Sequence, residues 1–209
     1  HTVRAYSAEV SRLARWLGCG LKRGFRRQRL RGYLRHLAGR ELAPSTITRA
    51  VAAIRRFGRW MWETGRADED EASGLASPKR SGGLPGFLSV SEVEQVLDGY
   101  DTSTPLGLRN RAMLEMLYGC GLRASECVSL AVEGADLKTG TVRVLGKGRK
   151  ERVVPVPSGS LSVLRRWMDS RGGVLGQRPD PGTVFLSVRG RRLDPRDVRR
   201  IVARGVSRA

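Results

Sequence analysis

Two cations in the sequence are set apart by the glycines around them. Arg123 follows Gly119 and Gly121, which are expected to end an apolar helix over 112–118, and it should begin a new helical turn. Lys147 stands between two glycines in a short turn 24 residues later. A fixed guanidinium can grip a phosphate through two parallel N–H bonds, and an ammonium adds a mobile point charge. The pair predicts phosphoryl chemistry on a polymer backbone.

The elements that position these two cations are predicted from turn residues and hydrophobic patterning. Ser89 and Glu92 form a capping box before a helix that extends to about residue 97. Residues 141–145 and 152–156 are rich in β-branched side chains and predict a hairpin around the turn that holds Lys147. The remaining expected elements are helices over 108–118, 161–168 and 194–206 and a brief strand over 184–187. Helices around a small antiparallel sheet indicate an α+β domain.

The N-terminal third has the pattern of amphipathic helices. Apolar residues recur at steps of three and four over 3–17 and 47–61, and a basic stretch at 22–31 leads into a helix between them. A segment rich in Pro, Gly and Ser follows and is expected to be a linker. The predicted organisation is an all-α helical bundle over 1–74, a linker over 75–87 and the α+β domain over 88–209.

The charge of the chain favours a polyanionic partner. Lys and Arg number 39 and Asp and Glu 20, which gives a formal net charge of +19. Both parts contribute, since residues 1–83 carry +11 and residues 84–209 carry +8. Two basic parts favour a clamp that closes on nucleic acid over a single basic tail. A G+C-rich coding bias could account for many of the arginines, but it does not explain the shortage of acids.

Several classes of protein are disfavoured. Cys19, Cys120 and Cys127 have no CxxC spacing and form no convincing zinc site with the two histidines, so reduced intracellular thiols are expected. No apolar run reaches membrane-spanning length and no signal peptide opens the chain, so we expect a cytoplasmic location and no membrane partner. The turn at 146–151 lacks the glycine spacing of a phosphate-binding loop.

Three runs together resemble a known family. LGLRNRAMLEMLYGCGLRASE, GKGRKERVVPV and GLPGFLSVSEVEQVL are similar to the tyrosine recombinases of the phage integrase family, Xer type. The resemblance covers nearly the whole chain and implies site-specific DNA recombination. It implies an N-terminal SAM-like helical core-binding domain and an α+β catalytic domain. In this family a tyrosine hydroxyl attacks the phosphodiester and forms a 3′-phosphotyrosyl link that stores the bond energy, so no cofactor or metal is required.

The resemblance also implies roles for single residues. Arg123 matches the arginine that binds the scissile phosphate and stabilises the transition state. Lys147 matches the hairpin lysine that protonates the leaving 5′ oxygen, with Lys150 and Arg152 as positional competitors. Glu126 is interpreted as a partner that orients the local structure. The structural alternatives are an arginine that caps a helix C-terminus and a solvated turn lysine.

Further DNA contacts are expected from both parts of the chain. The helix that resembles the family's major-groove element and the hairpin turn supply the candidates, which are Ser45, Thr46, Arg49, Arg55, Arg149 and Lys150. For any one of these residues a solvated surface side chain is an equally good explanation. Together they favour double-stranded DNA as the partner.

Other parts of the family pattern are missing from the sequence. The HxLRH box, a later His or Trp and the nucleophilic tyrosine near the C-terminus do not occur, and Tyr6, Tyr33, Tyr100 and Tyr118 do not match the nucleophile's place. We therefore expect a C-terminally incomplete fragment that cannot cleave or rejoin DNA by itself. Its homo- or hetero-oligomers with other recombinase subunits on DNA should be weakened.

Two alternatives belong to other functional classes. One is a non-catalytic DNA-binding protein that occupies recombination sites or modulates a full-length recombinase. The other is a basic RNA-binding protein, which leaves the pairing of the arginine motif with the hairpin unexplained. The target site and the choice between chromosome-dimer resolution, integration and cassette movement stay open.

Overall fold

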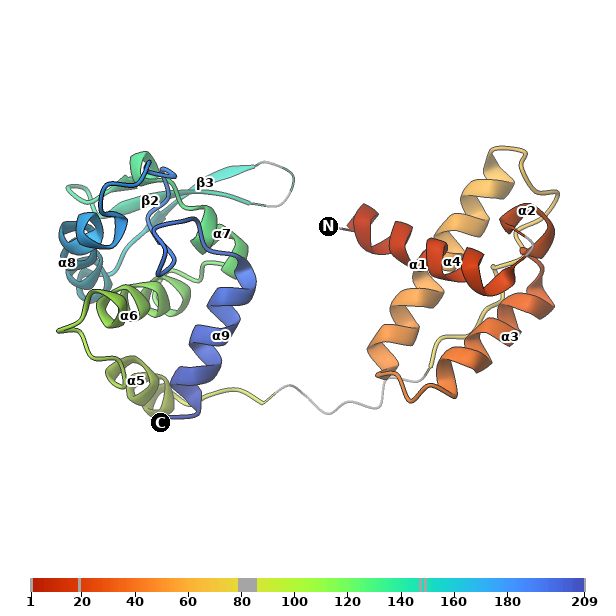
Figure 1. Ribbon diagram of the computed structural model, residues 1–209, viewed down its shortest axis with the longest axis horizontal. Helices are drawn as coiled ribbons and strands as arrows, with labels where there is room; N and C mark the ends of the chain where they lie inside the picture. The colour runs from red at the N-terminus through yellow and green to blue at the C-terminus, as the bar shows by residue number, and fades with distance from the viewer. Residues whose placement is uncertain (1, 19, 79–85, 147, 149, 209) are drawn as a thin grey trace. The chain divides into compact units, whose positions relative to one another are not determined.

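The computed structural model describes the whole chain except residues 1, 19, 79–85, 147, 149 and 209. It divides the chain into two compact units, His1–Pro85 and Gly86–Ala209 (Figure 1). Each unit buries an apolar core of its own, so each is described by itself.

The N-terminal unit is a helical bundle. Its helices are α1 (Thr2–Leu17), α2 (Leu21–Gly24), α3 (Arg27–Ala38) and α4 (Pro44–Glu63). Their apolar faces meet in one core, where Leu13, Leu30, Val51 and Ile54 are fully buried. The helices expected from hydrophobic periodicity are present, and α2 is an additional short helix at the start of the basic stretch.

The segment that follows α4 folds back across the bundle. Ala72 and Leu75 are buried in the core, and Glu71 accepts hydrogen bonds from the Arg27 N–H (2.9 Å) and from Nη1 of Arg26 (3.1 Å). Glu71 thereby pairs one of the N–H groups that the first turn of α3 leaves without a helical partner. Burial acts to raise the pKa of Glu71, but these hydrogen bonds outweigh it and lower the pKa. The segment that contains Glu71 therefore packs across the bundle and binds the start of α3.

The C-terminal unit is an α+β domain. Its elements are α5 (Val90–Asp98), α6 (Pro105–Tyr118), α7 (Ala124–Ser129), η1 (Val132–Gly134), β1 (Ala135–Asp136), β2 (Thr141–Leu145), β3 (Glu151–Pro155), α8 (Ser158–Leu175) and α9 (Pro195–Val206). The strands form an antiparallel sheet in the order β1-β2-β3, and the β2–β3 register pairs Val142 with Val154 and Leu145 with Glu151. Helices α6 and α8 pack against each other, and α9 runs beside α7 and α5 (Figure 1). The predicted hairpin and the capping box at Ser89 are both present.

The prediction of a strand over 184–187 is wrong. Val184, Phe185 and Leu186 are fully buried as a strand core would be, but the backbone makes only the isolated bridges Ala131–Thr183 and Leu186–Arg192. Side-chain donors occupy the carbonyl groups that a ladder would use. Nε1 of Trp167 binds the Val184 carbonyl (3.0 Å), and buried arginines bind those of Thr183 and Leu186. The apolar run is therefore held by side chains in place of a neighbouring strand.

Among the helices of the described residues, none has both the length and the apolar character that crossing a membrane requires.

Gly58 lies where α4 meets the segment that folds back over it. A methyl group at this position would lie 2.8 Å from Cβ of Ala72, 2.9 Å from Oδ1 of Asp70 and 3.0 Å from Cε1 of Phe25. We expect Gly58→Ala to lower the free energy of unfolding of this unit by about 1–3 kcal/mol, because an overpacked core must shift to make room. Urea denaturation followed by circular dichroism measures the change.

Gly32→Ala in α3 is the matched control. The added methyl group would lie 3.4 Å from Cη2 of Trp16, which is an ordinary contact. Alanine is the better helix former by about 1 kcal/mol, so this variant should be as stable as the parent or more stable. Equal destabilisation by the two substitutions would show that close packing at Gly58 is not the cause.

Candidate functional site

Gly119 and Gly121 shape the turn that leads to Arg123. A Cβ at Gly119 would lie 2.8 Å from Oγ of Ser160 and 3.0 Å from the carbonyl oxygen of Glu115, so glycine lets the end of α6 lie against the start of α8. Gly121 has a φ of 60°, in the left-handed region that favours glycine. The expectation that the helix ends here is correct. Gly119 thus serves the approach of α8, and Gly121 serves the turn itself.

Arg123 is the residue that precedes the first turn of α7. Its backbone N–H donates to Oε2 of Glu126 (2.8 Å), and its Nη1 donates to Oε1 of the same carboxylate (2.9 Å). The side chain is 69 % exposed. Within the described part of the chain its Nε and Nη2 groups have no acceptor. The alternative of a helix C-cap does not apply, since Arg123 lies at a helix N-terminus with two donor groups available to an external anion.

Glu126 is the buried centre of this arrangement. The residue is 2 % exposed, and its carboxylate also accepts hydrogen bonds from Nη1 (2.7 Å) and Nη2 (3.0 Å) of Arg152. The hydrogen bonds from Arg152 are the largest influence on its pKa, and with those from Arg123 they overcome the effect of burial and lower the pKa to about 2. The carboxylate is therefore ionised at neutral pH, and it is shared by two guanidinium groups.

Arg152 ties the hairpin to the start of α7. It lies in β3 opposite Val144 of β2, and its side chain is 40 % exposed. The turn is closed by a hydrogen bond from the Gly146 N–H to the carbonyl of Lys150 (2.8 Å). A Cβ at Gly146 would lie 3.4 Å from Nη1 of Arg152 and 3.7 Å from Oε1 of Glu126. The chain therefore passes directly over this ion pair one residue before Lys147.

The hairpin turn contains three of the predicted site residues. Lys147 and Arg149 lie outside the described residues. Lys150 is exposed. The sequence indicates Arg152 only as a competitor of Lys147 and does not predict its pairing with a buried carboxylate. A signal was present, because Arg152 and the half-buried Val154 lie two residues apart and so share one face of the strand.

The four candidates of the N-terminal unit lie on α4. Ser45 and Arg49 are exposed and Thr46 is half-buried. Nε of Arg49 lies 3.4 Å from Oε1 of Glu9, and Arg55 donates to the carbonyl of Leu75. Arg55 therefore anchors the segment that folds back over α4, and Arg49 is paired with the buried carboxylate of Glu9, although both arginines are exposed.

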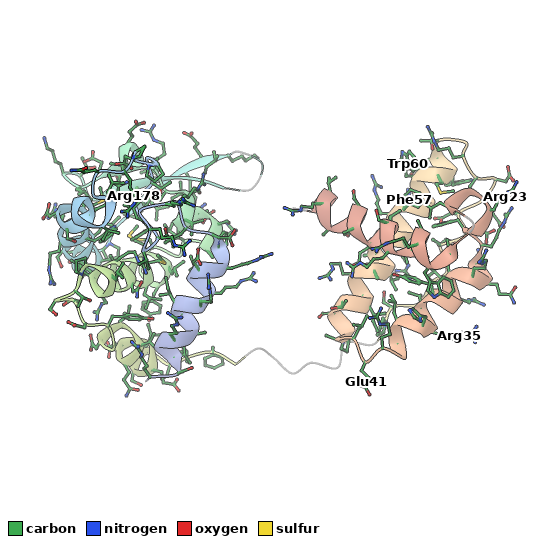
Figure 2. The ribbon with its side chains drawn as sticks, viewed as in Figure 1. Arg23, Arg35, Glu41, Phe57, Trp60 and Arg178 are labelled. Atoms are coloured by element: carbon green, nitrogen blue, oxygen red, sulfur yellow. The ribbon has the colours of Figure 1, made fainter. Side chains whose placement is uncertain are left out.

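Other side chains of this unit also project from its helices. Arg23 of α2 and Arg35 of α3 point away from the bundle, and Phe57 and Trp60 lie next to each other on α4 (Figure 2). The centroids of these two rings are 5.6 Å apart, and the Trp60 ring is partly exposed. The described residues include no cluster of His, Cys, Asp and Glu that could hold a metal ion.

Sequence comparisons match both units to one family. Residues 86–209 match the phage integrase family and residues 1–65 match the phage integrase N-terminal SAM-like domain, which confirms the predicted fold class. The tyrosine recombinase XerC of Xylella fastidiosa (strain M23) is 39 % identical over 185 residues, which are 87 % of this chain and 63 % of that protein. XerC of Pelobacter propionicus is 35 % identical over 207 residues, which are 97 % of this chain and 67 % of that protein. The chain thus spans about two thirds of the length of these relatives.

Solved structures share the fold. A lambda integrase tetramer bound to a Holliday junction has a TM-score of 0.70 at 16 % identity, covering 97 % of this chain and 56 % of that one. The XerH site-specific recombinase bound to difH substrate has a TM-score of 0.65 at 22 % identity, covering 87 % of this chain and 53 % of that one.

The shared carboxylate predicts an acid-sensitive contribution to stability. The pKa of Glu126 is held near 2, below its ordinary value of 4.5, so its contribution is complete above about pH 4.5 and is lost as the pH falls toward 2. We expect Glu126→Gln to lower the free energy of unfolding at pH 7 by about 3 kcal/mol, since one pKa unit corresponds to about 1.4 kcal/mol. The variant should then lose less stability than the parent between pH 5 and pH 3, as measured by urea denaturation.

Asp180 supplies the matched control, because its pairing with Arg171 also lowers its pKa to about 2. Asp180 is 43 % exposed, so solvent screens its pair and Asp180→Asn should lose only a small acid-sensitive contribution while it keeps that of the buried Glu126. An unchanged pH dependence in Glu126→Gln would mean that the shared ion pair does not stabilise the folded unit.

Proposed function

Because this chain belongs to the phage integrase family, we propose that it takes part in site-specific DNA recombination as a Xer-type tyrosine recombinase. Strands would be cleaved and rejoined through a 3′-phosphotyrosyl intermediate, with the nucleophilic tyrosine outside these 209 residues. The observation that carries the proposal is the buried Glu126 carboxylate, which anchors both the exposed Arg123 and, through Arg152, the hairpin next to it.

Arg123 is proposed to bind the scissile phosphate. Its Nε and Nη2 groups are available within the described part of the chain, and the contact with Glu126 fixes the orientation of the guanidinium. Two guanidinium groups around one carboxylate leave a net positive charge at the surface. Oriented donors of this kind stabilise the charge that builds on the phosphate oxygens in the transition state, because they need little reorganisation when that charge appears.

Lys147 is proposed to be the general acid for the leaving 5′ oxygen. The support is its position directly after Gly146, whose backbone lies against the Glu126–Arg152 ion pair. An ammonium group is a suitable general acid for this step, because it carries a proton that it can transfer to the leaving oxygen.

Double-stranded DNA is the proposed partner. The net charge of +19 supports a polyanion, and the lambda integrase and XerH structures that share this fold are bound to a Holliday junction and to difH substrate. Assembly with other recombinase subunits on DNA is proposed on the same ground. DNA as substrate also favours a cytoplasmic location, and no cofactor or metal is proposed.

The remaining proposals concern the division of labour between the two parts of the chain. Residues 1–74 are proposed as the core-binding domain, 75–87 as the linker and 88–209 as part of the catalytic domain. The proposed DNA contacts are those of Ser45, Thr46, Arg49, Arg55, Arg149 and Lys150. Arg55 has the weakest support, since it already binds the carbonyl of Leu75.

A phosphate contact by Arg123 predicts a change in the salt dependence of DNA binding. Arg123→Gln should reduce the slope of log K against log salt concentration by about 0.9, because one fewer phosphate is neutralised. Binding of a labelled duplex by fluorescence anisotropy at several salt concentrations measures the slope. Arg178→Gln is the control, since Arg178 is an exposed arginine beyond the end of α8 and outside the candidate site (Figure 2). Equal slopes for the two variants would contradict the phosphate contact.

The absence of the nucleophile's motif from these 209 residues predicts binding without a covalent product. Incubation with nicked suicide duplexes should give no covalent protein–DNA band in a denaturing gel. Tyr33 and Tyr100 are buried, and Tyr118 is 55 % exposed at the end of α6, close in sequence to Arg123. A covalent band that disappears in Tyr118→Phe would place the nucleophile at Tyr118 and overturn this assignment. DNA binding without a band is expected both of this fragment and of the non-catalytic binding protein, and an HxLRH box and a tyrosine encoded in frame after Ala209 would favour the recombinase over the binding protein.

A further inference from the structure

Arg109 of α6 is a buried cation with neutral partners. The residue is 5 % exposed, and its Nη1 donates to the carbonyl of Leu186 (2.8 Å). Nε (3.1 Å) and Nη2 (2.7 Å) both donate to Oδ1 of Asn110. No carboxylate among the described residues accepts a hydrogen bond from Arg109. A guanidinium has five N–H groups, so two of them remain available.

A second buried arginine of the same unit provides the contrast. Arg171 is 6 % exposed, and Asp180 takes its two Nη groups at 2.7 and 2.5 Å. A buried charge is costly unless a partner compensates it, and Arg171 has that partner. Burial lowers the pKa of Arg109, and the more distant Asp197 and Tyr100 only oppose this effect. The charge of Arg109 is therefore incompletely compensated.

Arg109 faces two cavities, of about 260 Å³ and about 220 Å³. The larger one is lined by Arg200 and Arg204 of α9, by Ser187 and by Asp197. Asp197 already accepts hydrogen bonds from the Asp194 N–H (2.8 Å) and from Arg200. The smaller cavity shares Arg204 and adds Arg208 and one carboxylate, that of Asp101, which accepts hydrogen bonds from the N–H and the hydroxyl of Ser103. Each cavity exceeds the space of several water molecules, at about 30 Å³ each in the liquid, and positive charge dominates its lining.

Asn110 is the partner of Arg109 that leaves its positive charge without a counter-ion. Its amide oxygen accepts two hydrogen bonds from Arg109 but carries no negative charge. An aspartate has the same shape and would place a charged oxygen at the same position. It would neutralise the guanidinium of Arg109 as an internal counter-ion.

We propose that the cavity at Arg109 binds a small oxyanion of the phosphate or sulfate class, with Arg109 as the buried anchor and Arg200 and Arg204 at the mouth. The site is separate from the one at Arg123, and the proposal does not depend on the recombination chemistry. The oxyanion can be a free ion or a phosphate of the DNA backbone, and experiment separates these two sources.

Asn110→Asp tests the proposal with a minimal change of shape. Inorganic phosphate is titrated against the 209-residue chain at constant ionic strength, with chloride as the compensating ion, and the melting temperature is followed. Phosphate should raise the melting temperature of the parent, since a ligand that binds only the folded state stabilises it. In Asn110→Asp the apparent dissociation constant for phosphate should rise at least about tenfold, because the internal carboxylate competes with the ligand.

Gln177→Glu is the matched control, since it makes the same amide-to-carboxylate change at an exposed position of the same unit. It should respond to phosphate as the parent does. Arg204→Gln removes an exposed cation shared by both cavities and should also weaken phosphate binding, which provides a test that leaves the buried Arg109 untouched.

Duplex DNA is the second arm of the experiment. If Asn110→Asp loses more DNA affinity than Gln177→Glu, the oxyanion is a backbone phosphate. If the two variants bind DNA equally while their phosphate responses differ, the ligand is a free oxyanion. The proposal is overturned if Asn110→Asp and Gln177→Glu behave alike in both arms.

Discussion

One buried carboxylate holds the candidate site together. Glu126 accepts hydrogen bonds from the backbone and side chain of Arg123 and from both Nη groups of Arg152. An unpaired carboxylate in this position would carry a large desolvation cost, and the donors that remove this cost come from two different elements, the start of α7 and strand β3. The base of the hairpin and the orientation of the exposed guanidinium therefore depend on the same ion.

Sharing the carboxylate also determines what Arg123 can do. Arg152 takes the two-point geometry that only a guanidinium offers, and Arg123 uses a single Nη together with its backbone N–H. A carboxylate bound to Arg123 alone would neutralise its charge and occupy its N–H donors. One negative charge between two positive ones instead leaves a surplus positive charge, and Arg123 is the more exposed of the two arginines, at 69 % against 40 %. The arrangement is rigid and still attractive to an anion.

Patterns along the chain predict the elements better than they predict the contacts between them. Periodicity and glycines located the helices, the hairpin and the helix start at Arg123, because these depend on neighbouring residues. The pairing of Arg152 with Glu126 spans 26 residues, and strand alternation places Arg152 on the face of Val154 without indicating which residue it would bind. The strand expected over 184–187 failed for a related reason, since side chains of distant helices occupy its carbonyls. The sequence supplied the site's candidates, and tertiary structure selected their partners.

Two buried arginines of the C-terminal unit differ in the charge of their partners. Arg171 is closed by the carboxylate of Asp180, which satisfies its charge and leaves it a structural role. Arg109 is held by the neutral oxygens of Asn110 and Leu186, which fix its position without cancelling its charge. The charge of Arg123 is also only partly neutralised, because its carboxylate partner, Glu126, binds Arg152 as well. A guanidinium that is held in place but not neutralised is a binding group, whether an amide or a shared carboxylate holds it. The chemistry of the holding group, more than the burial of the arginine, therefore separates the arginines that support this fold from those that can recognise an anion.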